Sequence, residues 1–253
     1  MKLNKIAYFS IGILMSQLTM AGSFTDTFEG PTHLNLNVYG FAADVDGSIG
    51  KGPYKYNVDQ PFKETVKELD HAYMLLADLS KGQWGVYVDK QAVKTSADIT
   101  ELNIPIALST KLDQSRYGIY YKAYVSPELT QQNYPKFIVE PTIGVHHTEA
   151  KAKLSVLNIN ADADADASWN EFFWGSRFKY NFNSPWNLAS ELTFGSYDSI
   201  SAHAYVGYRL PMFKQDFNLR AGYRYLKQDH DANNFNWNIK QRGPVIGINI
   251  PIF

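Results

Sequence analysis

Residues 200–210, with the sequence ISAHAYVGYRL, alternate between two kinds of side chain. Apolar and aromatic residues occupy every second position, and mostly small, polar or charged residues lie between them. Because successive side chains of a β-strand point to opposite faces, this period of two predicts a strand with one apolar and one polar face. Residues 217–225, FNLRAGYRY, repeat the pattern soon afterwards. The two stretches together predict neighbouring strands of an antiparallel sheet.

Alternation of the same kind recurs along most of the chain. The expected strands are 33–41, 71–80, 83–94, 104–126, 136–150, 169–182, 186–196, 200–210, 216–228 and 236–252. These segments predict an all-β fold, a single antiparallel transmembrane β-barrel of about ten strands. One alternative stays open, because 104–126 is either one long strand or a hairpin that turns at 113–115. A second hairpin near Thr148 would then give twelve strands, so the expected range is about eight to twelve.

The first residues indicate the compartment. Lys2 and Lys5 precede an apolar run over residues 6–18, which is too short to cross a bilayer as a helix. Small residues follow up to Ala21, where a signal peptidase would cut. We therefore predict a signal peptide over 1–21 and an outer-membrane barrel over 22–253.

Composition excludes several classes of protein. The chain has 24 Lys and Arg against 25 Asp and Glu, so it lacks the basic excess that is typical of a nucleic-acid binder. It has no cysteine, which excludes a disulfide scaffold, a thiolate metal site and a cysteine nucleophile. After residue 21 no stretch is long and apolar enough for a membrane helix, so a membrane-spanning mature protein must be a closed barrel.

Three further features favour an outer-membrane barrel over a soluble β-sandwich. Aromatic residues gather near the expected strand ends, as in the interfacial girdles of such barrels. Short turns at 80–83, 183–185 and 211–215 alternate with longer polar connections at 42–70, 158–168 and 228–234. The last strand ends in Phe253, which is similar to an outer-membrane assembly signal. Its isoleucines run out of phase with Phe253, and a bulge at Pro251 would restore the phase.

Four short motifs carry a resemblance to a known family. They are KGQWGVYVD at 81–89, GYR at 207–209, AGYRYL at 221–226 and GPVIG at 243–247. In this order and spacing they resemble a widespread family of uncharacterised Gram-negative outer-membrane β-barrels, of the outer-membrane-protein-A-like or porin superfamily type. The resemblance implies a barrel in the cell outer membrane and brings no known reaction. We expect as partners outer-membrane lipid and lipopolysaccharide, and the barrel-assembly machinery through the C-terminal strand. We expect a monomer and no nucleic acid.

The polar faces of the expected strands supply the candidate functional residues. In a barrel of about ten strands the lumen is filled by side chains, so its charges must be paired. The inward candidates are Asp78, Asp89, Arg116, Lys122, Glu140, Arg177, Glu191, Arg209, Arg220 and Arg224. An ion-pair network that plugs the lumen is the favoured interpretation, with Glu191 and Asp89 as partners for the surplus arginines. An anion-selective pathway, or a site for an acidic head group, is the alternative.

A short helix is expected in the first long loop. Phe62, Val66 and Leu69 share one helical face after Pro61, which is suitable for a first turn. So short a helix needs a surface to pack on. Two placements stay open, at the barrel mouth or on the outer wall.

The sequence does not favour an enzyme or a metal site. Ser201 and His203 share a strand face, as a lipid hydrolase would need, but no third orienting residue is identifiable. His146 and His147 point to opposite faces, and the aspartates of 162–166 lack the glycine and glutamate of a calcium loop. We therefore expect a non-enzymatic barrel without cofactors, acting as a structural, adhesion or narrow-pore protein, and expect 162–166 to lie in an external loop. An outer-membrane lipid-modifying hydrolase and a soluble periplasmic barrel or sandwich that binds a ligand are the alternatives.

Overall fold

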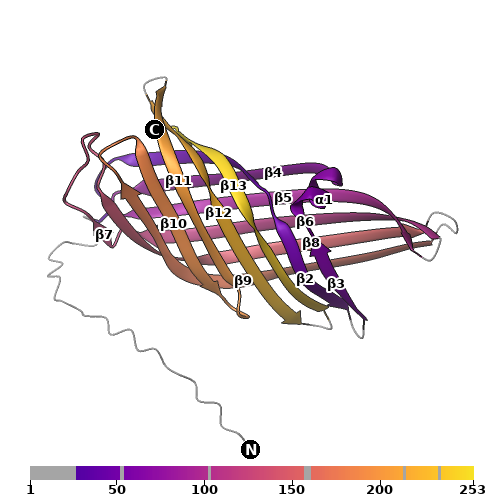
Figure 1. Cartoon of the computed structure of the whole chain (residues 1–253). Helices are drawn as coiled ribbons and strands as arrows, with labels where there is room; N and C mark the ends of the chain where they lie inside the picture. Colours follow the sequence, from indigo (N-terminus) through magenta and orange to yellow (C-terminus); the bar gives the residue numbers. More distant parts are fainter. Residues whose placement is uncertain (1–26, 52–53, 102–103, 157–160, 213–214, 233–234) are drawn as a thin grey trace, which may run out of the picture.

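The computed structural model describes residues 27–51, 54–101, 104–156, 161–212, 215–232 and 235–253 (Figure 1). The predicted signal peptide therefore lies outside the described residues. Within them no helix is long and apolar enough to cross a membrane.

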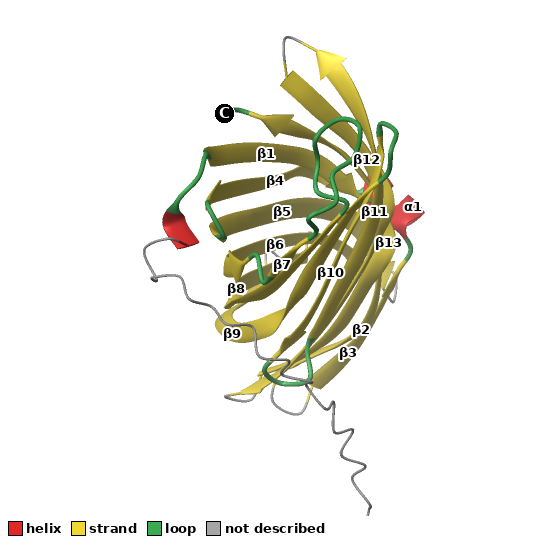
Figure 2. Ribbon diagram, turned by 90° about the vertical axis from the view of Figure 1, so that its left-hand side faces the viewer, coloured by secondary structure: helices red, strands yellow, loops and turns green. Residues whose placement is uncertain are grey.

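Ten strands form the wall of a closed barrel in the described part of the chain (Figure 2). They are β1 (Thr32–Phe41), β4 (Leu69–Lys81), β5 (Trp84–Glu101), β6 (Ile104–Tyr121), β8 (Phe137–Val156), β9 (Ala161–Asn181), β10 (Trp186–Gly195), β11 (Ile200–Met212), β12 (Gln215–Ala232) and β13 (Phe235–Pro251). Each pairs antiparallel with the next, and β1 pairs with β13 to close the circle. The predicted fold class and strand count are confirmed.

The twelve-strand alternative is wrong. β6 pairs with β5 and β8 without interruption through residues 113–115, and β8 runs through Thr148 in the same way. β1 and β13 stay in one register up to Pro251. Directly after it the register shifts by one residue, as the expected bulge requires, because the Ile252 amide donates to the Leu34 carbonyl at 2.7 Å while the Leu34 amide donates to Phe253. The carbonyl of Phe253 still accepts a hydrogen bond from the Leu34 amide at 2.9 Å, so pairing continues to the chain end.

The first long connection contains more structure than a loop. Strands β2 (Asp44–Lys51) and β3 (Tyr54–Gln60) form a hairpin whose first strand pairs with β13 beyond the end of β1. The helix α1 (Phe62–Lys67) follows as expected, and its first amide binds the Asp44 carboxylate at 2.8 Å. None of its residues is buried. The helix lies next to β2 on the outer side of the wall and not in the mouth (Figure 2).

The two ends of the barrel differ. One end, here called the short-turn end, carries the C-terminus and the tight turn at Gly82, which adopts a φ of 56°. At the other end, here called the long-strand end, β5, β6, β8 and β9 extend far past β10 (Figure 1). The external loop expected over 162–166 is wrong, because residues 161–168 of β9 pair with 149–156 of β8; residues 158–160 of the expected connection lie outside the described residues. Alternating alanine and aspartate there is itself a period-two strand pattern.

The outward face of the barrel is apolar over one zone, here called the outer belt. Its exposed members include Val86, Val88, Tyr117, Ile119, Ile143, Phe172, Trp174, Leu188, Leu192, Val206, Leu219, Tyr223 and Ile246. This confirms the predicted faces. The outer belt stops at a row of polar residues that are aligned across four strands, Lys90, Ser115, His147 and Asn170, here called the boundary row.

The wall splits into two wings just at this boundary. Pairing between β4 and β1 ends at Leu75, and Leu75 also pairs with Lys90 of the boundary row. Pairing between β9 and β10 ends at Phe173, which is close to Asn170 of the same row. Beyond the boundary, β4, β5, β6, β8 and β9 form one wing, and β12, β13, β2 and β3 form the other (Figure 1).

The inner faces of the two wings meet in an apolar core, here called the upper cluster. Trp169 of one wing packs against Trp237 of the other, with ring centroids 5.4 Å apart, and Ile239 lies beside them. Partly buried members complete it: Val45, Ile49, Val58, Leu112, Ala150, Ala167 and Phe235. The sequence analysis did not predict this core.

Candidate functional site

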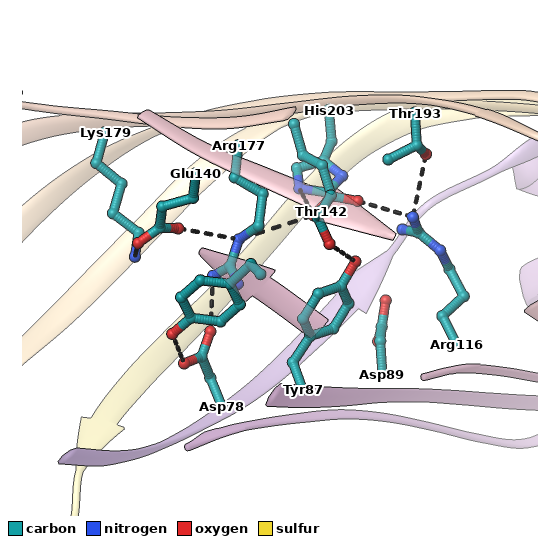
Figure 3. A network of polar contacts seen from close by, with 12 residues as sticks. Asp78, Tyr87, Asp89, Arg116, Glu140, Thr142, Arg177, Lys179, Thr193 and His203 are labelled. Atoms are coloured by element: carbon teal, nitrogen blue, oxygen red, sulfur yellow. Dashed lines mark hydrogen bonds and ion pairs between the residues drawn. The ribbon is translucent and has the colours of Figure 1, made fainter. Parts of the chain in front are cut away.

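Inside the outer belt the lumen holds three ionic groups, two of which share Arg177. The first is centred on Glu140, which has no exposed surface (Figure 3). Lys179 Nζ lies 2.9 Å from Glu140 Oε1, and Arg177 Nε lies 3.4 Å from Oε2. Arg177 also reaches Asp78 at 2.6 Å, and the Tyr120 hydroxyl donates to the same carboxylate at 2.7 Å. Both carboxylates are therefore compensated by cations.

The second group is centred on Glu191. Arg116 Nη2 donates to Glu191 Oε1 at 2.7 Å and to Thr193 Oγ1 at 3.1 Å (Figure 3). His203 Nε2 and Arg177 Nε each lie 4.0 Å from Glu191 Oε2. Arg177 therefore connects this group to the first one, so that one network links β4 and β6 to β9–β11 across the lumen.

The third group crosses the seam where the barrel closes. Arg224 Nη1 lies 3.4 Å from Asp89 Oδ2 and donates to the Tyr39 hydroxyl at 3.1 Å. The hydroxyl in turn donates to Asp89 Oδ1 at 2.5 Å. Arg224 is only 1% exposed, so its charge depends on these partners.

The structure divides the predicted lumen residues into two sets. Asp78, Asp89, Arg116, Glu140, Arg177, Glu191 and Arg224 are joined in the three ionic groups. Lys122, Arg209 and Arg220 are not, because no described carboxylate lies within ion-pair distance of them. Lys122 donates to the Gly82 carbonyl at 2.9 Å, and Arg220 donates to Asn37 at 3.0 Å. Arg209 donates to Asn181 and covers the Tyr134 ring. Pairing of Arg224 with Asp89 follows the sequence hypothesis, whereas Arg209 and Arg220 take amides.

Inward tyrosines are functional members that the list of charged residues left out. Arg177 lies over both the Tyr87 and Tyr120 rings, at 5.0 and 4.2 Å from their centroids. Gly85 and Gly118 make room for these rings, since a Cβ at either glycine would come within 2.5 Å of a ring atom. The sequence could have predicted their inward position, because each tyrosine lies an even number of residues from an inward charged residue of its own strand.

Both ends of the ionic zone are covered. At the short-turn end the loop over 126–136 crosses the mouth, where the Tyr134 hydroxyl donates to Asp216 and the Pro135 carbonyl accepts from Asn181 at 2.6 Å. Partial burial and the Asp216 carboxylate raise the pKa of Tyr134 to about 12. Toward the long-strand end, Gln114 donates to Gln228 at 2.7 Å below the upper cluster.

The residues considered for catalysis do not form a triad. Among the described residues, the buried Ser201 hydroxyl has no hydrogen-bond partner, and His203 faces Glu191. No group of three or more His, Asp or Glu side chains in the described ranges could hold a metal ion. His147 instead lies 2.8 Å from Asn170 in the boundary row.

Comparison with known proteins gives distant structural likenesses only. No family model matches the chain. No curated protein matches it either. The attachment invasion locus protein Ail of Yersinia pestis, solved with the heparin analogue sucrose octasulfate, has 12% identity and a TM-score of 0.40, over 88% of this chain and 99% of that one. CdiB from Acinetobacter baumannii has 12% identity and a TM-score of 0.39, over 79% of this chain and 40% of that one. The toluene transporter TbuX of Ralstonia pickettii has 9% identity and a TM-score of 0.28, over 87% of this chain and 89% of that one.

Proposed function

We propose that this protein is an integral outer-membrane β-barrel with a plugged lumen, a non-enzymatic structural barrel that displays its two wings outside the cell. The observation that carries the proposal is the outer belt around a closed barrel whose interior holds the three ionic groups. An apolar face of this size has no partner within the chain, and lipid is the solvent that suits it.

The dimensions of the outer belt support a membrane span. A tilted transmembrane strand needs about 9–11 residues, and the outward apolar residues of β12 and β9 run over 217–225 and 172–180. Aromatic pairs border the zone. Trp84 and Tyr121 lie 4.9 Å apart by ring centroids near the short-turn end, and Trp174 and Phe194 lie 5.4 Å apart near the boundary row. Such girdles are typical of membrane barrels.

The split of the wall supports the same placement. Within lipid every backbone group needs a partner, so the barrel must be closed there. In water an open strand edge is hydrated. We therefore place the boundary row at the outer lipid surface, the wings outside the cell and the short-turn end in the periplasm. Lipid and lipopolysaccharide are the partners of the outer belt, β13 is the strand that the assembly machinery receives, and the barrel is a monomer.

The orientation is tested with an inserted epitope tag. A tag between β5 and β6, at the tip of one wing, should bind antibody on intact cells. The same tag at the β4–β5 turn, at Gly82, should bind antibody only after the outer membrane is permeabilised. The reverse result would contradict the orientation, and recovery of the untagged protein as a soluble monomer without detergent would contradict membrane insertion.

The plug is tested by conductance. Because the loop over 126–136, the ionic groups and the upper cluster block the described lumen one after another, the purified barrel should give no steady current in planar bilayers. A general porin reconstituted in the same way serves as the positive control, and heat-modifiable gel migration verifies that the barrel is folded. Large and stable anion-selective steps would overturn the plug.

A further inference from the structure

We propose that the lumen holds a binding site for a small oxyanion, a carboxylate or a phosphate, on the guanidinium of Arg220. The site is a cavity of about 250 Å³ within the ionic zone. Its wall includes Asn37 of β1, His203 and Tyr205 of β11, Arg220 of β12 and Asn249 of β13. The proposal goes beyond the plugged barrel, since a plug needs only internal pairs.

The charges around the cavity are unevenly matched. Asp78, Asp89 and Glu191 also line it, and each already accepts from an arginine: Arg177, Arg224 and Arg116. Arg220 differs from these arginines, because no described carboxylate lies within ion-pair distance of it. A charge that is kept away from bulk water without a counter-ion is strongly destabilising, so the cavity has a cation that an anion would compensate.

The hydrogen bonds of Arg220 leave one edge of its guanidinium unused. Nη1 donates to Asn37 Oδ1 at 3.0 Å. Nε is buried and has no partner among the described residues, and no hydrogen bond from Nη2 joins it to them. Nε has almost no accessible surface, so Nη2 is the donor of this edge that an oxyanion in the cavity can reach. A hydrogen bond from a guanidinium to a carboxylate or phosphate oxygen is charge-assisted and therefore strong.

Amide side chains surround this part of the lumen. The residues directly opposite Arg220 on its two neighbouring strands are Gly207 on β11 and Gly247 on β13. A Cβ at Gly207 would come within 2.4 Å of Asn187 Oδ1 and 2.7 Å of Asn218 Oδ1, so these two amides occupy the lumen in front of that glycine. Asn37 and Asn249 line the cavity as well, so neutral polar groups and no further carboxylate lie on this side of Arg220.

The test measures anion binding to the folded barrel in detergent. Acetate and inorganic phosphate are titrated separately while sodium chloride keeps the ionic strength constant, and heat of binding and thermal unfolding are followed. We expect saturable binding to the wild type, with a rise in unfolding temperature, and at least about tenfold weaker binding to Arg220→Gln, because a charge-assisted hydrogen bond is lost. The arm with the tighter binding distinguishes a carboxylate ligand from a phosphate ligand.

Arg209→Gln is the matched control. Arg209 is also a lumen arginine without a described carboxylate, but it covers Tyr134 and does not line the cavity. This variant should bind the anion as the wild type does. Equal binding by Arg220→Gln, or no saturable binding by the wild type, would overturn the proposal.

A direct measurement keeps the test valid if Arg220→Gln does not fold. In wild-type protein with ¹⁵N-labelled arginine, one Nε–H resonance should shift on anion titration. The same resonance should be absent from Arg220→Lys, which identifies it. A shift of other arginine resonances with no change at Arg220 would contradict the assignment. Because the measurement uses detergent-folded protein, its outcome is separate from the membrane orientation and from conductance.

Discussion

The apolar face of a strand points outward in the barrel half of the molecule, within the outer belt, and inward in the half formed by the two wings. On β9 within the outer belt, Trp174 points outward and Arg177 points into the lumen; beyond the boundary row, Asp166 is exposed and Trp169 is buried. β13 inverts in the same way, with Ile246 exposed in one half and Ile239 buried in the other. The backbone alternation continues unchanged, and only the chemistry of the two faces is exchanged.

In the proposed placement, this inversion marks where the surroundings change from lipid to water. A wall surrounded by lipid gains nothing from turning apolar side chains inward, so its interior is held by hydrogen bonds and ion pairs. A wall surrounded by water is stabilised by an apolar core in the ordinary way. The two wings therefore resemble a small β-sandwich that stands on the barrel, and substitutions in the two halves test whether their surroundings differ.

The largest expected effect is the loss of a buried ion-pair partner in the barrel half. Glu191→Ala leaves Arg116 buried without its carboxylate, and we expect a loss of about 3–5 kcal/mol in the free energy of unfolding. Glu149→Ala, which removes the exposed partner of Lys151 on a wing, should have no measurable effect. Urea unfolding in detergent, followed by tryptophan fluorescence, measures both. Equal losses would contradict the contrast between the halves.

The second largest difference in stability between the two halves is expected when an arginine is introduced on the outer face of each. Leu219→Arg in the outer belt should destabilise the barrel in lipid by about 2–4 kcal/mol if it lies near the midplane. Ser168→Arg, on the outer face of a wing, should change stability by less than about 0.5 kcal/mol. Unfolding in lipid vesicles is the measurement. Similar tolerance at both positions would show that the outer belt does not face lipid.

Two isoleucines on β13 provide a smaller and more local comparison. Ile239→Val removes a methyl group from the upper cluster and should cost about 0.5–1.5 kcal/mol. Ile246→Val removes one from the outer belt, where lipid fills the space, so its unfolding free energy should stay close to that of the wild type. The expected difference is seen in the protease resistance of the wings together with urea unfolding. If Ile246→Val were the more damaging, the assignment of the two faces would be reversed.

The sequence predicted the barrel half well and the wings poorly, for a physical reason. Within the outer belt, aromatic and β-branched residues alternate with charges, which is a strong strand signal. Residues 161–168 alternate between alanine and aspartate or serine, which are weak strand formers, so their equally regular pattern was interpreted as a loop. The lumen residues were identified from parity alone. Their partners were not, because the reach of Arg209 and Arg220 to amides depends on the barrel's curvature and on the loop over 126–136.

The smallest expected effect is at the short-turn mouth, where the lumen meets water again. Tyr134→Phe removes the hydrogen bond to Asp216, and because Tyr134 is only partly buried we expect a loss of about 0.5 kcal/mol. Its pKa is raised from 10.0 to about 12, so the folded protein holds this proton more tightly than the unfolded chain does. The contribution is therefore complete below pH 10 and is lost as the pH rises toward 12.

The difference in unfolding free energy between wild type and Tyr134→Phe should accordingly shrink between pH 10 and pH 12 and stay constant below that window. Absorbance near the phenolate band checks the same ionisation, since the variant should lack one tyrosine that loses its proton near pH 12. Asp216→Asn is the matched control, because it keeps the hydrogen-bond acceptor while removing the charge that raises this pKa. A difference that grew with pH, or one that was unchanged across the window, would mean that Tyr134 does not hold the loop over the mouth.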